Sequence, residues 1–239
     1  MDIGENISDS IRYPTSDLGK LLILGIIMII PLVNFIGMGY FLRALKSNLA
    51  GISELPNFDD VGELFIEGLK LFIVGIIYSI PVWIIAAGLG AGQNVVMNAG
   101  MLSGAALYAL ILGYIIYVIL AIIIGFIEII AVANLAYNDG EFSAAFRFTE
   151  ILDHISQIGW ADYMIWYIVV VLVSLIIGLI AVAITFALAI TLIGIILIPV
   201  LFILVISYIS LFYARSLSLL FLSQEKIYSY QKSVQEPSK

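Results

Sequence analysis

The most restrictive feature of the sequence is the length of its uncharged apolar runs. Residues 71–127 and residues 163–214 contain no Asp, Glu, Lys or Arg. With 63% hydrophobic residues overall, no soluble fold could cover so much apolar surface. The runs are continuous rather than alternating in polarity, which favours helices over barrel strands. We therefore expect an all-α polytopic membrane bundle with about five hydrophobic segments and two amphipathic interfacial helices.

Each long run must fold back, because the first would measure about 85 Å as one helix. Clustered Gly, Gln and Asn residues over 88–104 predict the first turn, and Thr191–Gly194 predicts the second. The predicted membrane domain covers residues 21–222, between a polar N-terminal interfacial segment (1–20) and a loose polar C-terminal tail (223–239). Its expected spans are residues 21–42, 71–87, 102–127, 163–188 and 195–214.

Two charged connectors, residues 55–70 and 141–157, separate the apolar runs. Each carries apolar side chains at helical spacing and is expected to lie at the membrane surface. The predicted apolar faces are Phe58, Val61, Phe65 and Leu69 in the first connector, and Phe142, Phe146, Thr149, Leu152 and Ile155 in the second. The connectors resemble each other, either as a weak internal repeat or because each leads back into the membrane.

The first connector also carries an acidic set that is a candidate partner-facing surface: Asp59, Asp60, Glu63 and Glu67. The alternative is a solvated helix face without a partner.

Lys and Arg residues lie in both connectors and near the C-terminus, and the two predicted turns have none. The positive-inside rule therefore predicts a multi-pass cell-membrane protein with both connectors and the C-terminus in the cytoplasm. Five spans would then place the N-terminus, with Arg12 and Lys20, outside. Alternatively, residues 21–42 break around Pro31 and return to the same side as a re-entrant hairpin. We favour the single span because of its length.

Glu128 is the acidic residue within a long helical apolar run, and it has two interpretations. It is either a proton or cation site inside the membrane or a carboxylate at the point where the helix emerges. His154, the single histidine, is expected to be a surface residue beside Glu150 and Asp153. The sequence predicts no catalytic, cofactor-binding or metal-binding residues and no cofactor. Without a basic cluster, nucleic acid is not an expected partner.

Two classes of function follow. Small residues at four-residue spacing predict a helix-packing ridge at Ala105, Ala109, Gly113, Ala121 and Gly125. This favours a non-enzymatic component of the lipid bilayer that packs with itself as a homo-oligomer or with another membrane protein. The alternative is a small transporter or permease whose spans are kinked or broken at Pro31, Pro81 and Pro199.

One part of the chain resembles a known family. The resemblance is based on Gly39-Tyr40, Arg43, Gly51, Leu55-Pro56, Phe58-Asp59-Asp60, Glu63-Leu64-Phe65, Gly68-Leu69-Lys70, Tyr78 and Pro81. They resemble the archaeal and bacterial membrane family called domain of unknown function 4013, from which Val61 departs where an aromatic residue often stands. The resemblance implies a multi-pass membrane protein with no established activity, so no catalytic residue is transferred from it.

Overall fold

The structure is a computed structural model that describes residues 2–98 and 103–235, with side chains as far as Ser223. Within these ranges the elements are helical, in the order α1 (Ile3–Arg12), η1 (Tyr13–Ser16), α2 (Leu18–Ile29), α3 (Asn34–Leu49), α4 (Val61–Asn98), α5 (Gly104–Tyr137), η2 (Phe142–Phe146), α6 (Phe148–Ile158), α7 (Trp160–Ala189) and α8 (Leu192–Gln235). Among the described residues, four helices are long and apolar enough to cross a membrane: α4, α5, α7 and α8 as far as Ser223. A shorter apolar helix, α2, makes the fifth hydrophobic segment. The expected helical membrane bundle is confirmed.

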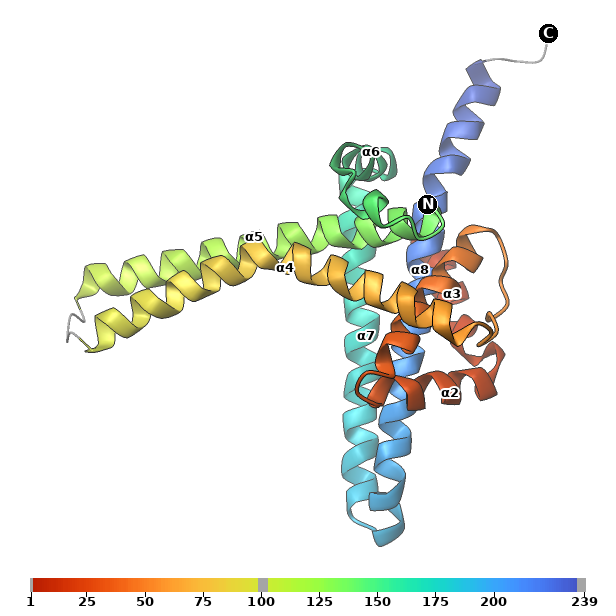
Figure 1. The fold of residues 1–239 in the computed structure, drawn as a ribbon, viewed down its shortest axis with the longest axis horizontal. Coiled ribbons are helices and arrows are strands. Elements are labelled where there is room, and N and C mark those ends of the chain that lie inside the picture. The colour runs from red at the N-terminus through yellow and green to blue at the C-terminus, as the bar shows by residue number, and fades with distance from the viewer. Residues whose placement is uncertain (1, 99–102, 236–239) are drawn as a thin grey trace.

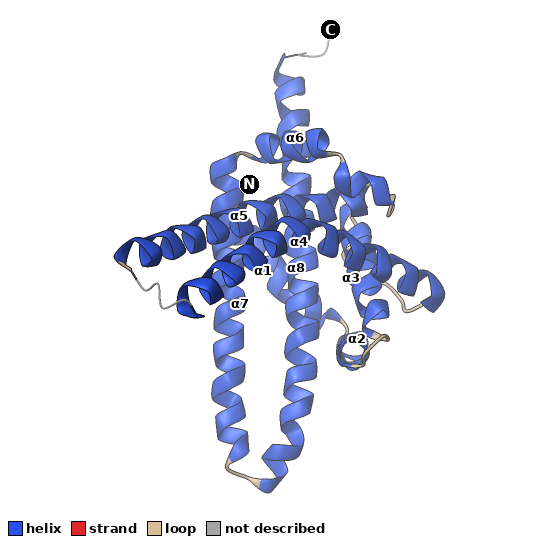
Figure 2. Ribbon diagram, turned by 60° about the vertical axis from the view of Figure 1, so that its left-hand side comes forward, coloured by secondary structure: helices blue, strands red, loops and turns tan. Residues whose placement is uncertain are grey.

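The long helices form two hairpins that extend from a common base in different directions (Figures 1 and 2). Helices α4 and α5 form one hairpin, and α7 and α8 form the other. The base contains α1, α2, α3 and α6 packed around the inner halves of the hairpins. Its core includes the fully buried side chains of Tyr40, Leu64, Ile130, Trp166 and Phe212. The outer halves of the hairpins are mostly exposed and apolar, as lipid-facing helices are.

Residues 21–42 do not form the single span that we favoured. Helix α2 ends at Ile29, Leu32 takes a positive φ of 68°, and α3 begins at Asn34. Helices α2 and α3 fold back and pack against each other. A Cβ at Gly37 on α3 would lie in contact with the Met28 side chain on α2. Pro31 interrupts the helical hydrogen bonding as expected. The segment has the form of the re-entrant hairpin that was the alternative.

Both ends of this short hairpin lie at the same loop. Lys20, in the first turn of α2, donates from Nζ to the carbonyl of Leu55 at 2.7 Å. The hydroxyl of Tyr40, on α3, donates to the carbonyl of Pro56 at 2.8 Å. The start of α2 and the first half of α3 are therefore both held on this loop.

The turns between long helices differ in part from expectation. The glycines at 88, 90 and 92 lie inside α4, which continues to Asn98, so the first turn is narrower than 88–104; residues 99–102 lie outside the described residues. A continuous helix satisfies its own backbone groups in lipid, which outweighs the cost of glycine there. The second turn, at Ile190–Thr191, begins one residue before the predicted one. Helices α4 and α8 run on through Pro81 and Pro199.

The C-terminal tail was expected to be loose, but α8 continues to Gln235. Residues 223–235 contain neither Gly nor Pro, so no residue stops the helix. Pro237 lies outside the described residues.

The connectors also fold differently from two separate surface helices. Residues 55–60 are a loop, and α4 begins at Val61 and runs on unbroken. Leu64, Glu67 and Gly68 face inward there, whereas Val61 is exposed. In the second connector, a break at Arg147 separates η2 from α6 and shifts the helical phase. Ile155 is buried as predicted, but Ala144, Ala145, Ile151 and Ile158 are buried as well, and the predicted inward residues Thr149 and Leu152 are exposed.

Two glycines decide how closely α3 and α4 cross. A Cβ at Gly68 would overlap the carbonyl oxygen of Phe35, and a Cβ at Gly39 would overlap that of Leu64. The backbones therefore touch at this crossing, and any side chain would force them apart.

We predict that Gly68→Ala lowers the free energy of unfolding by about 1–3 kcal/mol, because overpacking a tight contact displaces backbone. Gly62, six residues earlier on α4, has nothing within 4 Å of its Cβ position and supplies the control. Gly62→Ala should be neutral or stabilising by up to about 1 kcal/mol. Reversible unfolding in mixed micelles measures both variants, and equal effects would contradict the close crossing.

Candidate functional site

A buried ion pair joins the two connectors at the base. Nζ of Lys46, on α3, donates to Oε1 of Glu67 at 2.5 Å and to Oδ1 of Asp139 at 3.2 Å. The Glu67 side chain is 6% exposed, whereas that of Asp139 is 98% exposed. Lys70 donates to the carbonyl of Gly140 at 2.9 Å. Gly140 has a φ of 76°, and a Cβ there would lie 2.9 Å from the Lys46 nitrogen. The turn after α5 is thus held on α3 and α4.

Arg215, at the point where the apolar part of α8 ends, joins the N-terminal segment to the end of α3 and the loop after it. It is 8% exposed, and its Nε and Nη2 donate to Oδ2 of Asp9 at 2.8 and 2.6 Å. Nη1 donates to Oδ1 of Asn48 at 2.9 Å, and Nη2 reaches Oγ of Ser53 at 3.3 Å. The guanidinium also lies over the ring of Tyr13, with its central carbon 5.7 Å from the ring centre. One buried charge therefore contacts α1, η1, α3 and the loop after α3.

A second polar contact holds α1 on the hairpin of α7 and α8. Nε1 of Trp166 donates to Oγ of Ser216 at 2.8 Å, and that hydroxyl donates to Oδ1 of Asn6 at 2.6 Å. Nδ2 of Asn6 donates to the Ser216 carbonyl at 3.0 Å. Asn6 and Ser10 are buried and Ile7 packs against the core, so α1 packs in part through polar side chains, while Ile11 is 41% exposed.

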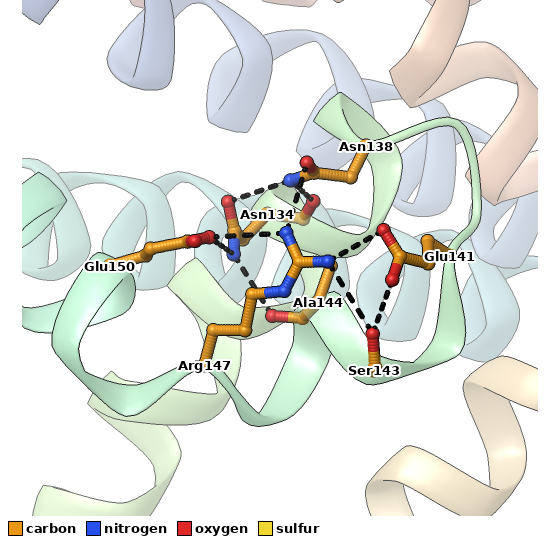
Figure 3. Close-up of polar contacts among 7 residues, drawn as sticks. All are labelled: Asn134, Asn138, Glu141, Ser143, Ala144, Arg147 and Glu150. Atoms are coloured by element: carbon orange, nitrogen blue, oxygen red, sulfur yellow. Dashed lines mark hydrogen bonds and ion pairs between the residues drawn. The ribbon is translucent and has the colours of Figure 1, made fainter.

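Arg147 organises the second connector (Figure 3). Its guanidinium donates to Oε2 of Glu141 at 2.6 Å and lies 3.6 Å from a carboxylate oxygen of Glu150. The Ser143 hydroxyl donates to the other oxygen of Glu141 at 2.5 Å. These two donors, Ser143 first, hold the pKa of the exposed Glu141 carboxyl below its ordinary value. The cluster ties the turn to α6, beneath which Asn134 donates to the Ala144 carbonyl at 2.9 Å.

The acidic set of the first connector is divided by the fold. Asp59 and Asp60 precede α4 and are exposed, and Asp60 has a positive φ of 50°. Glu63 accepts from Arg43 at 2.8 Å. Glu67 points into the base, so it is not part of an exposed surface. The four acids do not form one partner-facing face, because α3 covers the side of the helix that carries Glu67.

Glu128 lies on α5 opposite Gly75 of α4, with Oε1 3.5 Å from the Cβ position of that glycine. It is half-buried, and no side chain in the described ranges forms a hydrogen bond or ion pair with it. His154 packs beside Phe221, with 4.5 Å between ring centres. No group of three or more His, Cys, Asp or Glu residues in the described part of the chain is placed to hold a metal ion.

Two hollows adjoin these groups. An open cleft of about 510 Å³ with a mixed polar and apolar lining lies between the end of α3 and the end of α5, and its polar residues include Arg43, Lys46, Ser47 and Asp139. An apolar pocket of about 160 Å³ lies where the α4–α5 hairpin meets the second connector, lined by Tyr78, Pro81, Ile127, Phe146 and Phe148 among others. The cations of the cleft already have carboxylate partners.

The comparison with protein families matches a model described as "Protein of unknown function (DUF4013)" over residues 23–186. The chain belongs to this family. No curated protein and no solved structure matches the chain.

The residues that carry the family resemblance hold the base together. Gly39 and Gly68 allow the close crossing, and Gly51 adopts a positive φ of 82° after α3. Tyr40 stacks on Phe58 with ring centres 4.1 Å apart. Tyr78 donates to the Ala145 carbonyl at 2.7 Å. In this DUF4013 protein the motif is explained by contacts between helices.

Sequence reasoning missed the buried polar residues around Arg215. Asn6, Ser10, Asn48 and Ser216 are buried, yet polar residues near helix ends are ordinarily solvated. The four-residue spacing of Asn6 and Ser10 is the signal that could have indicated a polar contact face.

We predict that Lys46→Met lowers the free energy of unfolding by about 3–5 kcal/mol, because it leaves the buried Glu67 carboxylate unpaired. Lys46→Met/Glu67→Met should recover most of the loss. The matched control is Glu63→Gln at the exposed Arg43 pair, which should cost at most about 1 kcal/mol. Reversible unfolding in mixed micelles provides the measurement. Equal losses in the single and double variants would show that the pair is not the cause.

Proposed function

We propose that this DUF4013 protein is a non-enzymatic membrane component that acts by packing against further transmembrane helices. The observation that supports this proposal is that the outer halves of its two hairpins lie outside the packed base. Exposed apolar residues there include Leu107 and Ile111 on α5 and Ile176 and Leu179 on α7. The base, in contrast, is occupied by contacts within the chain.

The helix-packing ridge on α5 supports this proposal. Ala105 and Ala109 are exposed near the outer end of the hairpin, and Gly125 has nothing within 4 Å of its Cβ position. Gly113 packs against Leu89 of α4, so part of the ridge serves the hairpin itself. Small residues allow a second helix to approach closely, and close approach drives helix association in lipid.

The alternative of a small transporter rested on broken spans. Helices α4 and α8 are unbroken at Pro81 and Pro199, and Pro31 interrupts only the short α2–α3 segment. No specific observation in the described residues favours transport.

The orientation of the protein follows from its cations. Lys20, Arg43, Lys46, Lys70, Arg147 and Arg215 form their contacts at the base. By the positive-inside rule, this end lies in the cytoplasm together with both termini, and the hairpins point outward from it.

We predict that Ala109→Cys, in a chain that has no native Cys, forms disulfide-linked dimers in native membranes under mild oxidation. Ile111→Cys is the matched control, because two residues along a helix point to nearly opposite faces. Electrophoresis without reductant measures the dimer fraction. Equal or absent dimers from both variants would contradict self-association through this face.

We also predict that single Cys residues at Ser8 and Ser143 react with an impermeant maleimide from the cytoplasmic side. Asn94→Cys, near the end of α4, should react from the opposite side. The extent of labelling is compared between right-side-out and inverted vesicles. If the Cys residues at positions 8 and 143 react from opposite sides of the membrane, the four-span orientation is wrong.

A further inference from the structure

Glu128 is placed where three long helices meet. It lies on α5, opposite Gly75 on α4, and within electrostatic reach of the Tyr213 hydroxyl on α8. Gly75 is five residues beyond Lys70 along α4, or about 8 Å further from the polar base. The carboxyl group is thus more than one helical turn inside the apolar part of the hairpin.

The ionisable groups that face Glu128 are phenols. Helix α4 contributes Tyr78, whose hydroxyl already donates to the Ala145 carbonyl, and α8 contributes Tyr213. Tyr167 of α7 lies beside Tyr213. No charged side chain among the described residues is placed against the Glu128 carboxyl.

The basic residues of the base have other partners. Lys46 contacts Glu67 and Asp139, Lys70 contacts the Gly140 carbonyl, and Arg215 contacts Asp9. A negative charge on Glu128 would therefore be uncompensated by the side chains that the structure describes. An unpaired charge in apolar surroundings is costly, so the group takes up a proton or a cation.

The surroundings favour a proton over a metal cation. Hard cations such as Ca²⁺ and Mg²⁺ need about six or more oxygen ligands, from the protein or from water. No cluster of three acidic or histidine ligands is present in the described part of the chain. A proton needs only the carboxyl group itself.

We propose that Glu128 is a proton-binding site at the junction of α4, α5 and α8, and that its carboxyl group holds a proton at neutral pH. Loss of this proton places an uncompensated charge between the two hairpins. The site is independent of the proposed helix-packing function, since it concerns the inner part of the bundle and not its outer halves.

The test is labelling with dicyclohexylcarbodiimide, which reacts with protonated carboxyl groups in apolar surroundings. The full chain is reconstituted in phosphatidylcholine nanodiscs, and modified peptides are quantified by mass spectrometry. We expect about tenfold more label on Glu128 than on the exposed Asp139 near neutral pH, and loss of this label at alkaline pH. Labelling of Glu128 no stronger than that of Asp139 would overturn the proposal. If Na⁺ protected Glu128 from labelling in a saturable manner at neutral pH, the proposal would also be wrong, because the site would then hold a cation.

A second measurement uses Glu128→Gln, which mimics a protonated carboxyl group. We expect this variant to fold, to melt within error of the native chain near neutral pH, and to lack the labelled peptide. Glu128→Asp, which keeps an ionisable group, should retain labelling. A Glu128→Gln variant that fails to fold would show that the ionised carboxylate is required, and the proposal would be wrong.

Discussion

Arg215 is the buried charge on which the base of the molecule depends. A guanidinium cannot lose its proton in a protein, so its burial requires acceptors from the surrounding chain. Asp9 supplies them from α1, and Asn48 and Ser53 supply them from the end of α3 and the loop after it, both far from Arg215 in sequence. Because α8 is a long apolar helix, its polar end determines where these segments gather. Helix α1 and the end of α3 both contact α8 at Arg215, so residues 21–42, which connect them, fold back.

The close crossing of α3 and α4 provides the second constraint. Gly39 and Gly68 bring the two backbones into contact, and this places Lys46 against Glu67. That ion pair then holds the turn at Gly140, so that both connectors meet. The family motif contains the two glycines of this crossing and Lys70, which binds the Gly140 carbonyl. These residues make contacts between segments of the chain and do not indicate a chemical reaction.

The candidate site was predictable only in part. The long apolar helices and, to within one residue, the second turn follow from local composition, because lipid requires helices. The break at Pro31 was the alternative and not the favoured prediction, because the length of residues 21–42 also fits a single span. The inward direction of Glu67 and the exposure of Leu152 did not follow, because each depends on a neighbouring helix. Asn6 and Ser216 are buried for the same reason, since each satisfies the other across more than two hundred residues. Glu128 was recognised from its charge, but the absence of a cation beside it among the described residues depends on where Lys46, Lys70 and Arg215 point.

The sequence by itself determined that this protein is surrounded by lipid and that it is helical. Uncharged apolar runs of this length require a lipid environment, and in lipid a helix satisfies its own backbone hydrogen-bonding groups. The tertiary structure decided how residues 21–42 fold back and which polar groups share the base. Those outcomes depend on pairing distant groups, such as Arg215 with Asp9, whose energies no local pattern of residues encodes.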